Sequence, residues 1–121
     1  MIKGIGLDIT ELARIQKAIQ RNNRILDRIL TNQEKAHYQT LTSEKRKAEF
    51  AAGRFAAKEA YAKARGTGLG SLGLQDIEIL PNAAGAPVLK AADSEAGEHF
   101  FLSITHSDTY AAAQVIITQG E

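Results

Sequence analysis

A single long helical pattern dominates this sequence and limits how the rest of the chain can fold. Residues 42–66 read TSEKRKAEFAAGRFAAKEAYAKARG, an uninterrupted run that is rich in strong helix formers. Thr42 or Ser43 can cap its start, and Gly66 can end it, because glycine readily adopts the left-handed conformation that closes many helices. We expect this helix to be the backbone of the domain, with the other elements packed around it.

The remaining patterns predict helices early in the chain and strands late. A strand at residues 2–9 precedes three helical segments, at 10–22, 23–30 and 31–41, the last opened by a capping box of Thr31 and Glu34. After a glycine-rich connection at 66–73, strands follow at 75–80, 88–91, 99–107 and 109–118, the first two forming a hairpin through the turn at 81–87. A loop or one helical turn is expected at 92–98. This order favours an α+β fold over a doubly wound parallel sheet.

Composition narrows the class of protein. With 121 residues, the chain is expected to form one domain over residues 1–121. A net charge of +1 favours neither nucleic acid nor a membrane as partner, and without cysteine there is no disulfide or thiolate zinc site. No run approaches the roughly 18 apolar residues of a membrane span, so a soluble, cytoplasmic protein is expected. Abundant alanine and few aromatic residues indicate close packing of small residues, with burial completed by another subunit.

Asp8 stands between the first strand pattern and the next helical pattern, in GIGLDITELARI. It is either a helix cap or a carboxylate that the strand presents for chemistry. In the long helix, Glu59 shares a face with alanines, whose small side chains would leave room beside the carboxylate. Glu59 and Lys63 could form an ordinary i, i+4 helix pair. Alternatively, Asp8 and Glu59 could hold Mg²⁺, which binds one or two carboxylates and completes its shell with water and phosphate oxygens.

A phosphate group would need cations or free backbone N–H groups nearby, and the sequence offers both. Arg54, Lys58 and Lys63 lie on the long helix, and the turn GTGLG follows it. The glycines form neither a Walker A motif nor G-x-G-x-x-G after a strand, so a flexible helix exit is the alternative. His106, in LSITHSD, is either a histidine satisfied by neighbouring hydroxyls or backbone, or a residue that binds a ligand.

Arginines recur on the helical segments that follow the first strand. They are Arg14, Arg21, Arg24 and Arg28. Such a run usually marks a solvated helix face. The alternative is a docking surface for an acidic protein partner, which charge would steer into place.

Several of these segments together resemble one family. GIGLDITELARI, FAAGRFAAKEAYAKARGTG, LQDIEI, NAAGAP and LSITHS occur in the order and approximate spacing of bacterial holo-acyl-carrier-protein synthases, the small trimeric type of 4′-phosphopantetheinyl transferase. The most specific part is G-x-D near residue 8 followed about fifty positions later by R-[FW]-A-x-K-E-A. Leu7 and Thr10 replace β-branched residues that are more usual there, and Phe55 stands where many relatives carry tryptophan.

The resemblance implies Mg²⁺-dependent transfer of the 4′-phosphopantetheine group from coenzyme A to a serine of apo acyl carrier protein, in fatty acid biosynthesis. Adenosine 3′,5′-bisphosphate would be released. It implies that Asp8 and Glu59 bind Mg²⁺ and that Lys63 stabilises charge on the transferring or leaving oxygens. The serine proton would go to Glu59 or to a metal-bound water. The residues implied around coenzyme A are Arg54, Lys63, Gly66, Gly68, Asn82, Pro87 and His106.

Arg14, Arg21 and Arg24 fall where this family meets the acidic helix of acyl carrier protein. The implied fold is one long helix packed on a small, mainly antiparallel sheet, in a homotrimer whose sites are completed by neighbouring subunits. Two other functions stay open at this point: a non-catalytic module that binds an acidic protein partner, and a metal-dependent phosphohydrolase.

Overall fold

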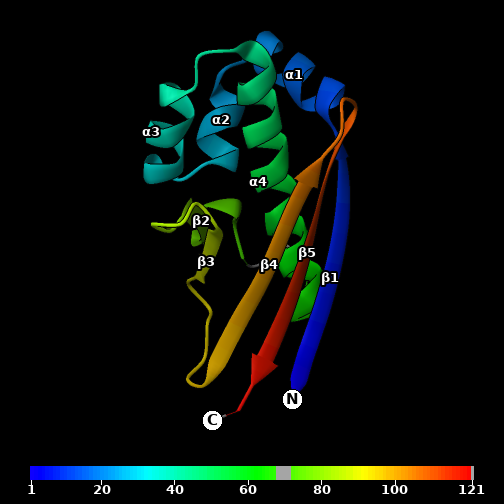
Figure 1. Cartoon of the computed structure of the whole chain (residues 1–121), viewed down its shortest axis with the longest axis vertical. Coiled ribbons are helices and arrows are strands. Elements are labelled where there is room, and N and C mark those ends of the chain that lie inside the picture. The colour runs from blue at the N-terminus through cyan, green and yellow to red at the C-terminus, as the bar shows by residue number, and fades with distance from the viewer. Residues whose placement is uncertain (68–71, 121) are drawn as a thin grey trace.

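The structure is a computed structural model that describes residues 1–67 and 72–120 (Figure 1). Its central element is helix α4, Glu44–Arg65. The hydroxyl of Ser43 accepts a hydrogen bond of 3.0 Å from a backbone N–H of the first turn, and Gly66, with φ of 86°, ends the helix. The predicted long helix is confirmed, and Ser43 is the residue that caps it.

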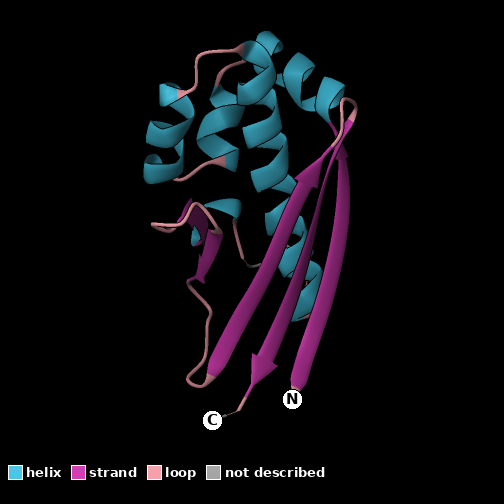
Figure 2. Cartoon of the chain, in the orientation of Figure 1, coloured by secondary structure: helices cyan, strands magenta, loops and turns pink. Residues whose placement is uncertain are grey.

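A three-stranded antiparallel sheet covers one side of α4, in the order β1, β5, β4 (Figures 1 and 2). These strands are β1 at Ile2–Glu11, β4 at Glu98–His106 and β5 at Tyr110–Gln119. Strand β1 approaches the helix so closely that a Cβ atom on Gly6 would lie 1.9 Å from the carbonyl oxygen of Ala60. Helix and sheet form the two layers of an α+β fold, as the sequence predicted.

Strand β1 extends beyond the end that the sequence pattern indicated, and the next helix begins later. Pairing with β5 continues to Glu11, which lies opposite Tyr110, and helix α1 covers Leu12–Arg21. Glu11 precedes the helix and makes no side-chain cap bond. Because Asp8 lies inside the strand, its interpretation as a helix cap is wrong.

Three shorter helices gather around the upper half of α4 in Figure 1. They are α1, α2 at Arg24–Ile29 and α3 at Asn32–Thr40. The predicted capping box opens α3: the Thr31 hydroxyl accepts a 3.2 Å hydrogen bond from the backbone N–H of Glu34, whose carboxylate accepts one of 2.8 Å from the Thr31 N–H. No helix in the described part of the chain is both long enough and apolar enough to cross a lipid bilayer.

A small hairpin lies beside the main sheet. Its strands are β2 at Ile77–Pro81 and β3 at Pro87–Ala91, which pair antiparallel as predicted. The predicted strand starts late, because Leu74–Asp76 form one turn of 3₁₀ helix instead of extended chain. Away from the sheet, α4 contacts α1, α2 and α3 (Figure 1), and the buried side chains of the hairpin belong to the same apolar cluster as those of α4.

Apolar side chains fill the space between the layers in two clusters. The first joins Ala56 and Ala60 of α4 to alternate residues of β5, among them Val115. Both alanines are fully buried. The sequence suggested that the alanines on the Glu59 face leave space for a ligand. This prediction is wrong for these two alanines, because the sheet occupies the space beside them.

Candidate functional site

The side chain of Asp8 projects from β1 toward α4. Its Oδ1 accepts a 3.2 Å hydrogen bond from Nζ of Lys63, and its Oδ2 accepts one of the same length from the hydroxyl of Thr10. Lys63 also donates to the backbone oxygen of Leu7, at 3.0 Å. Because the lysine bonds strand backbone and carboxylate together, the ion pair is between Asp8 and Lys63, and the i, i+4 pair with Glu59 that the sequence left open is wrong.

Glu59 lies close enough to Asp8 and Lys63 for their charges to act on its carboxyl group, and we call these three residues the carboxylate cluster. Burial and, next, the charge of Asp8 raise the pKa of its carboxyl group above the usual range. The cations of Lys63 and Arg14 act on this pKa in the opposite direction. Among the described residues, the Glu59 carboxylate has no hydrogen-bonding partner. Two carboxylates thus lie near one another, and one of them is free to take a ligand.

These donors fit Mg²⁺. The ion prefers oxygen ligands, and it commonly takes only one or two protein carboxylates while substrate phosphates and water fill the other positions. The residues that the structure describes contain no cluster of three or more His, Cys, Asp or Glu side chains that could hold a metal ion. Asp8 and Glu59 form the kind of open carboxylate pair that a cation shared with a phosphate substrate requires.

A second group of candidate residues surrounds a cavity of about 240 Å³, which we call the arginine cavity. It lies between α3, α4, the hairpin turn and β4. Its walls are formed by His37, Leu41, Arg46, Glu49, Phe50, Gly53, Arg54, Gly85, Pro87, Ile104 and His106. Three of the residues predicted around coenzyme A, namely Arg54, Pro87 and His106, therefore meet in one place.

Contacts within the arginine cavity hold its cations in place. The Arg54 guanidinium lies over the ring of Phe50 at 4.1 Å, and its Nε donates to the backbone oxygen of Ile79 at 3.3 Å. Burial lowers the pKa of Arg54, although an arginine remains charged at neutral pH. His106 Nδ1 lies 3.4 Å from Oε2 of Glu49, so its partner is a carboxylate and not the neighbouring hydroxyls that the sequence suggested.

Other predicted residues have different surroundings. The side-chain oxygen of Asn82 accepts from the N–H groups of Ala84 and Ala86, at 2.9 and 3.0 Å, and so shapes the turn of the hairpin without lining the cavity. Gly68 lies outside the described residues. Lys58 is fully buried and bonded to Glu34, so the predicted contact of Lys58 with phosphate is wrong.

The arginines of α1 and α2 lie on the surface of the chain. Arg21, Arg24 and Arg28 line one depression of about 400 Å³. Arg14, nearer the start of α1, is close enough to Glu59 to affect its pKa. Arg14 is therefore the arginine of this group that lies near a carboxylate, and the other three gather at the depression between α1 and α2.

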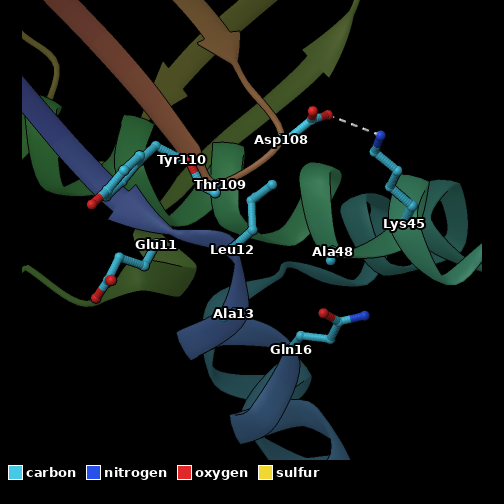
Figure 3. A pocket seen from close by; sticks show the side chains of 9 residues that line it. All are labelled: Glu11, Leu12, Ala13, Gln16, Lys45, Ala48, Asp108, Thr109 and Tyr110. Carbon is cyan, nitrogen blue, oxygen red and sulfur yellow. Dashed lines mark hydrogen bonds and ion pairs between the residues drawn. The ribbon is translucent and has the colours of Figure 1, made fainter.

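A further cavity, of about 520 Å³, lies at the junction of β1 and α1 (Figure 3). Lys45 and Asp108 point toward each other across it and form an ion pair of 3.2 Å. The backbone N–H of Leu12 donates to the oxygen of Thr109 at 2.9 Å, which fixes the start of α1 on the turn between β4 and β5. None of the predicted site residues lines this cavity.

The carboxylate cluster and the arginine cavity are separate within one chain. Arg54 and Glu59 both belong to α4, but five residues turn the helix by about 140°, so the two side chains leave it in different directions. The cavity wall includes none of Asp8, Glu59 and Lys63. A single chain thus presents two separate groups of candidate residues.

Comparison with known proteins shows which family the chain belongs to. The family model of the 4′-phosphopantetheinyl transferase superfamily matches residues 4–115. The chain belongs to this superfamily. Similar superfamily members include the holo-[acyl-carrier-protein] synthase of Oceanobacillus iheyensis, 50% identical with 100% of both chains covered, and that of Bacillus velezensis, 54% identical over 97% of this chain and 96% of the relative.

Solved structures of the superfamily share the fold. A crystal structure of a holo-(acyl-carrier-protein) synthase from Bacillus anthracis, in complex with CoA (3′,5′-ADP), has a TM-score of 0.89 and 43% identity, with 99% of both chains covered. The synthase from Neisseria meningitidis has a TM-score of 0.85 and 30% identity, covering 98% of this chain and 100% of that one. The predicted family resemblance is confirmed.

Most residues that line the arginine cavity were not predicted from the sequence, among them three with charged or aromatic side chains on α4. Arg46, Glu49 and Phe50 all lie on α4 before Arg54. The sequence did contain a pattern for two of them: residues 46, 50 and 54 follow one another at intervals of four, the spacing that brings helix side chains onto one face. The spacing became informative only once Arg54 was known to face a cavity.

Proposed function

We propose that the chain transfers the 4′-phosphopantetheine group of coenzyme A to a serine hydroxyl of apo acyl carrier protein and releases adenosine 3′,5′-bisphosphate. The observation that carries the proposal is the open pair of Asp8 and Glu59 beside the Lys63 ammonium. Superfamily membership and synthase relatives near 50% identity over the full chain support it. The reaction belongs to fatty acid biosynthesis, and the cytoplasm is the compartment we propose for it.

Asp8 and Glu59 would hold Mg²⁺, which when bound would neutralise charge on the phosphate oxygens of coenzyme A. Lys63 has one N–H left after its bonds to Leu7 and Asp8, and this donor can reach a phosphate oxygen whose negative charge grows during transfer. The raised pKa of Glu59 makes its carboxylate a better proton acceptor near neutral pH, which suits it to receive the serine proton.

The arginine cavity would receive anionic parts of coenzyme A. Arg46 and Arg54 provide planar donor groups for phosphate, and His106 adds a further donor beside them. Gly66 and Gly68, after the helix that carries Lys63, would let the backbone approach the pyrophosphate.

A second copy of the chain would complete each site, in a homotrimer. The sheet face that points away from α4 is apolar and uncovered: Ile5 and Phe101 both lie opposite Ile116 and form a row across three strands. Ile5 is 56% exposed and Phe101 58%. Such a patch is typical of an interface between subunits, and closed symmetry would bring the carboxylate cluster of one chain to the arginine cavity of the next.

Complementation between two inactive variants tests this arrangement. Asp8→Ala and Arg54→Ala chains, each inactive alone, are expected to recover activity when co-expressed, because a mixed trimer has one interface that unites an intact Asp8 with an intact Arg54. Trimers purified through two different affinity tags should reach at most about one third of wild-type activity. Asp8→Ala mixed with Glu59→Ala is the control and should stay inactive. Both residues belong to the carboxylate pair of one chain, so every chain in the mixed trimer carries a damaged pair. Mixed trimers without recovery would contradict shared sites.

Charge reversal tests the arginine surface as the docking site of the carrier protein. Arg14→Glu with Arg21→Glu is expected to raise KM for the carrier about tenfold while KM for coenzyme A stays unchanged, because an acidic partner loses its attraction. The difference from wild type should shrink at high salt, which screens exposed charges. Lys90→Glu, which reverses a single charge on β3, is the control and should leave both KM values unchanged. A salt-independent effect would argue against electrostatic docking.

One assay decides among the candidate functions. The purified chain is incubated with coenzyme A, Mg²⁺ and apo acyl carrier protein, and the carrier is then weighed by mass spectrometry. A gain of one phosphopantetheine supports transfer. Phosphate release without this gain would support a phosphohydrolase, and binding without either reaction would support a non-catalytic module.

A further inference from the structure

A buried polar cluster lies beneath the arginine cavity. The Glu34 side chain is fully buried, and its Oε1 accepts hydrogen bonds from the Thr31 N–H at 2.8 Å and from Nζ of Lys58 at 2.6 Å. Its Oε2 accepts the backbone N–H of Ile79 at 2.7 Å. Lys58, which is also fully buried, donates in addition to the backbone oxygen of Ile29 at 2.7 Å. One ion pair thus joins α2, α3, α4 and the hairpin.

Arg54 extends this cluster to the cavity wall. Ile79 gives its N–H to Glu34, and its carbonyl oxygen accepts a hydrogen bond from Nε of Arg54. Arg54 lies one turn before Lys58 on α4, so the two cations leave the helix on the same side. Both backbone groups of Ile79 are therefore held by side chains of neighbouring helices, and the position of strand β2 depends on them.

The elements that this ion pair joins are the elements that wall the arginine cavity. Helix α3 carries Glu34 and, one turn later, His37. Helix α4 carries Lys58 and Arg54, and the hairpin held at Ile79 carries Pro87. Neither Glu34 nor Lys58 lines the cavity.

A buried ion pair is a poor way to gain stability alone. Removing two charges from water costs free energy that their attraction offsets only with good geometry, and apolar side chains of similar size often serve as well. Burial indeed lowers the pKa of Lys58, against the opposing effect of Glu34. What an apolar pair could not supply is the directional bonds to the backbone of Ile79 and Ile29.

We propose that Glu34 and Lys58 are positioning residues that set the shape of the arginine cavity and thereby the affinity for the nucleotide part of coenzyme A. The inference rests on the proposed function in so far as that cavity receives coenzyme A. Neither residue touches substrate; they act by fixing α3, α4 and the hairpin relative to one another.

Two isosteric substitutions at opposite ends of the molecule test the proposal. Glu34→Gln removes the charge but keeps the size and one acceptor oxygen. Glu98→Gln is the matched control, because the Glu98 side chain is also a fully buried carboxylate, held by Arg65 at 2.6 Å and Lys3 at 2.7 Å, far from the cavity walls. Glu34→Gln alone leaves the Lys58 ammonium buried without its carboxylate partner, which could unfold the chain. The double variant Glu34→Gln/Lys58→Met leaves no unpaired charge and so keeps the test possible in a folded chain.

Isothermal titration calorimetry with adenosine 3′,5′-bisphosphate and with coenzyme A gives the first measurement. Glu34→Gln and the double variant are expected to raise both Kd values about tenfold, since misplaced contacts of around 1 Å weaken a site strongly. KM for coenzyme A should rise in parallel, while KM for the carrier protein stays within about twofold. Glu98→Gln should lower Tm without changing either Kd. Unchanged Kd values in both Glu34 variants would overturn the proposal.

Amide hydrogen exchange gives a measurement that does not depend on the substrate. In Glu34→Gln, the amides of Ile79 and of the rest of the hairpin should exchange faster, while those of β4 and β5 keep their wild-type rates. If the wild-type chain bound no adenosine 3′,5′-bisphosphate, the proposed function would fail, whereas hairpin exchange would still test the positioning role of Glu34. Unaltered hairpin exchange in folded Glu34→Gln would overturn it.

Discussion

Replacing Asp8 by Asn, or Glu59 by Gln, is expected to lower kcat about a hundredfold to a thousandfold, the usual loss when one charge-stabilising group is removed from a transition state. Each change keeps the shape of the side chain but withdraws one negative oxygen ligand from the pair. In Asp8→Asn, the amide oxygen can still accept a hydrogen bond from Lys63, so the local structure should persist. Higher Mg²⁺ concentrations should restore part of the activity, because the variants bind the ion more weakly.

Stability should hardly change in these variants. The Lys63 side chain is 55% exposed, and an ion pair with such an exposed partner contributes at most about 1 kcal/mol to folding. Glu11→Gln, three residues after Asp8 on the same strand, is the control and should retain wild-type kcat. Circular dichroism and thermal melts would establish folding, and the carrier mass assay would give kcat. Full activity of either site variant at ordinary Mg²⁺ would contradict the assignment of the pair.

The predictable part of the fold is local. The capping box of Thr31 and Glu34 and the end of α4 at Gly66 follow from residues that are neighbours in sequence. The end of β1 was misplaced because it depends on a remote partner: the strand continues as far as β5 offers backbone groups, and the last pair joins Glu11 to Tyr110. Because of that pairing, Asp8 lies inside the strand and does not cap a helix.

The predictable part of the site follows the same division. Asp8 and Glu59 could be proposed from residue type, but their separation from Arg54 within one chain could not. Lys58 was misjudged because α4 is covered on several sides, so polar and apolar residues do not divide it into an exposed and a buried face. Only the contact with Glu34, which is 24 residues away in sequence, shows that Lys58 is internal.

The close approach of β1 to α4 connects stability with the spacing of Asp8 and Glu59. Gly6→Ala would place a Cβ atom 1.9 Å from the oxygen of Ala60 and 2.7 Å from the nitrogen of Ala64, both of them backbone atoms. Backbone of a buried helix cannot turn aside as a side chain can, so strand and helix must separate. We expect the free energy of unfolding to fall by about 3 kcal/mol, at the upper end of the usual cost of overpacking.

This separation should also reduce activity in the molecules that remain folded. Gly6 lies two residues before Asp8, and Ala60 directly follows Glu59, so pushing the strand from the helix moves the two carboxylates apart. Urea unfolding would measure stability, and kcat would be measured at a temperature where the variant is fully folded. Gly73→Ala is a suitable control, because its nearest neighbour would be the Asp76 side chain at 3.5 Å, an ordinary contact. A folded Gly6→Ala variant with wild-type kcat would contradict this expectation and would mean that the chemistry tolerates a wider spacing of the carboxylates. A loss of kcat in the folded variant would show that the absence of one methyl group at residue 6 sets the distance between Asp8 and Glu59.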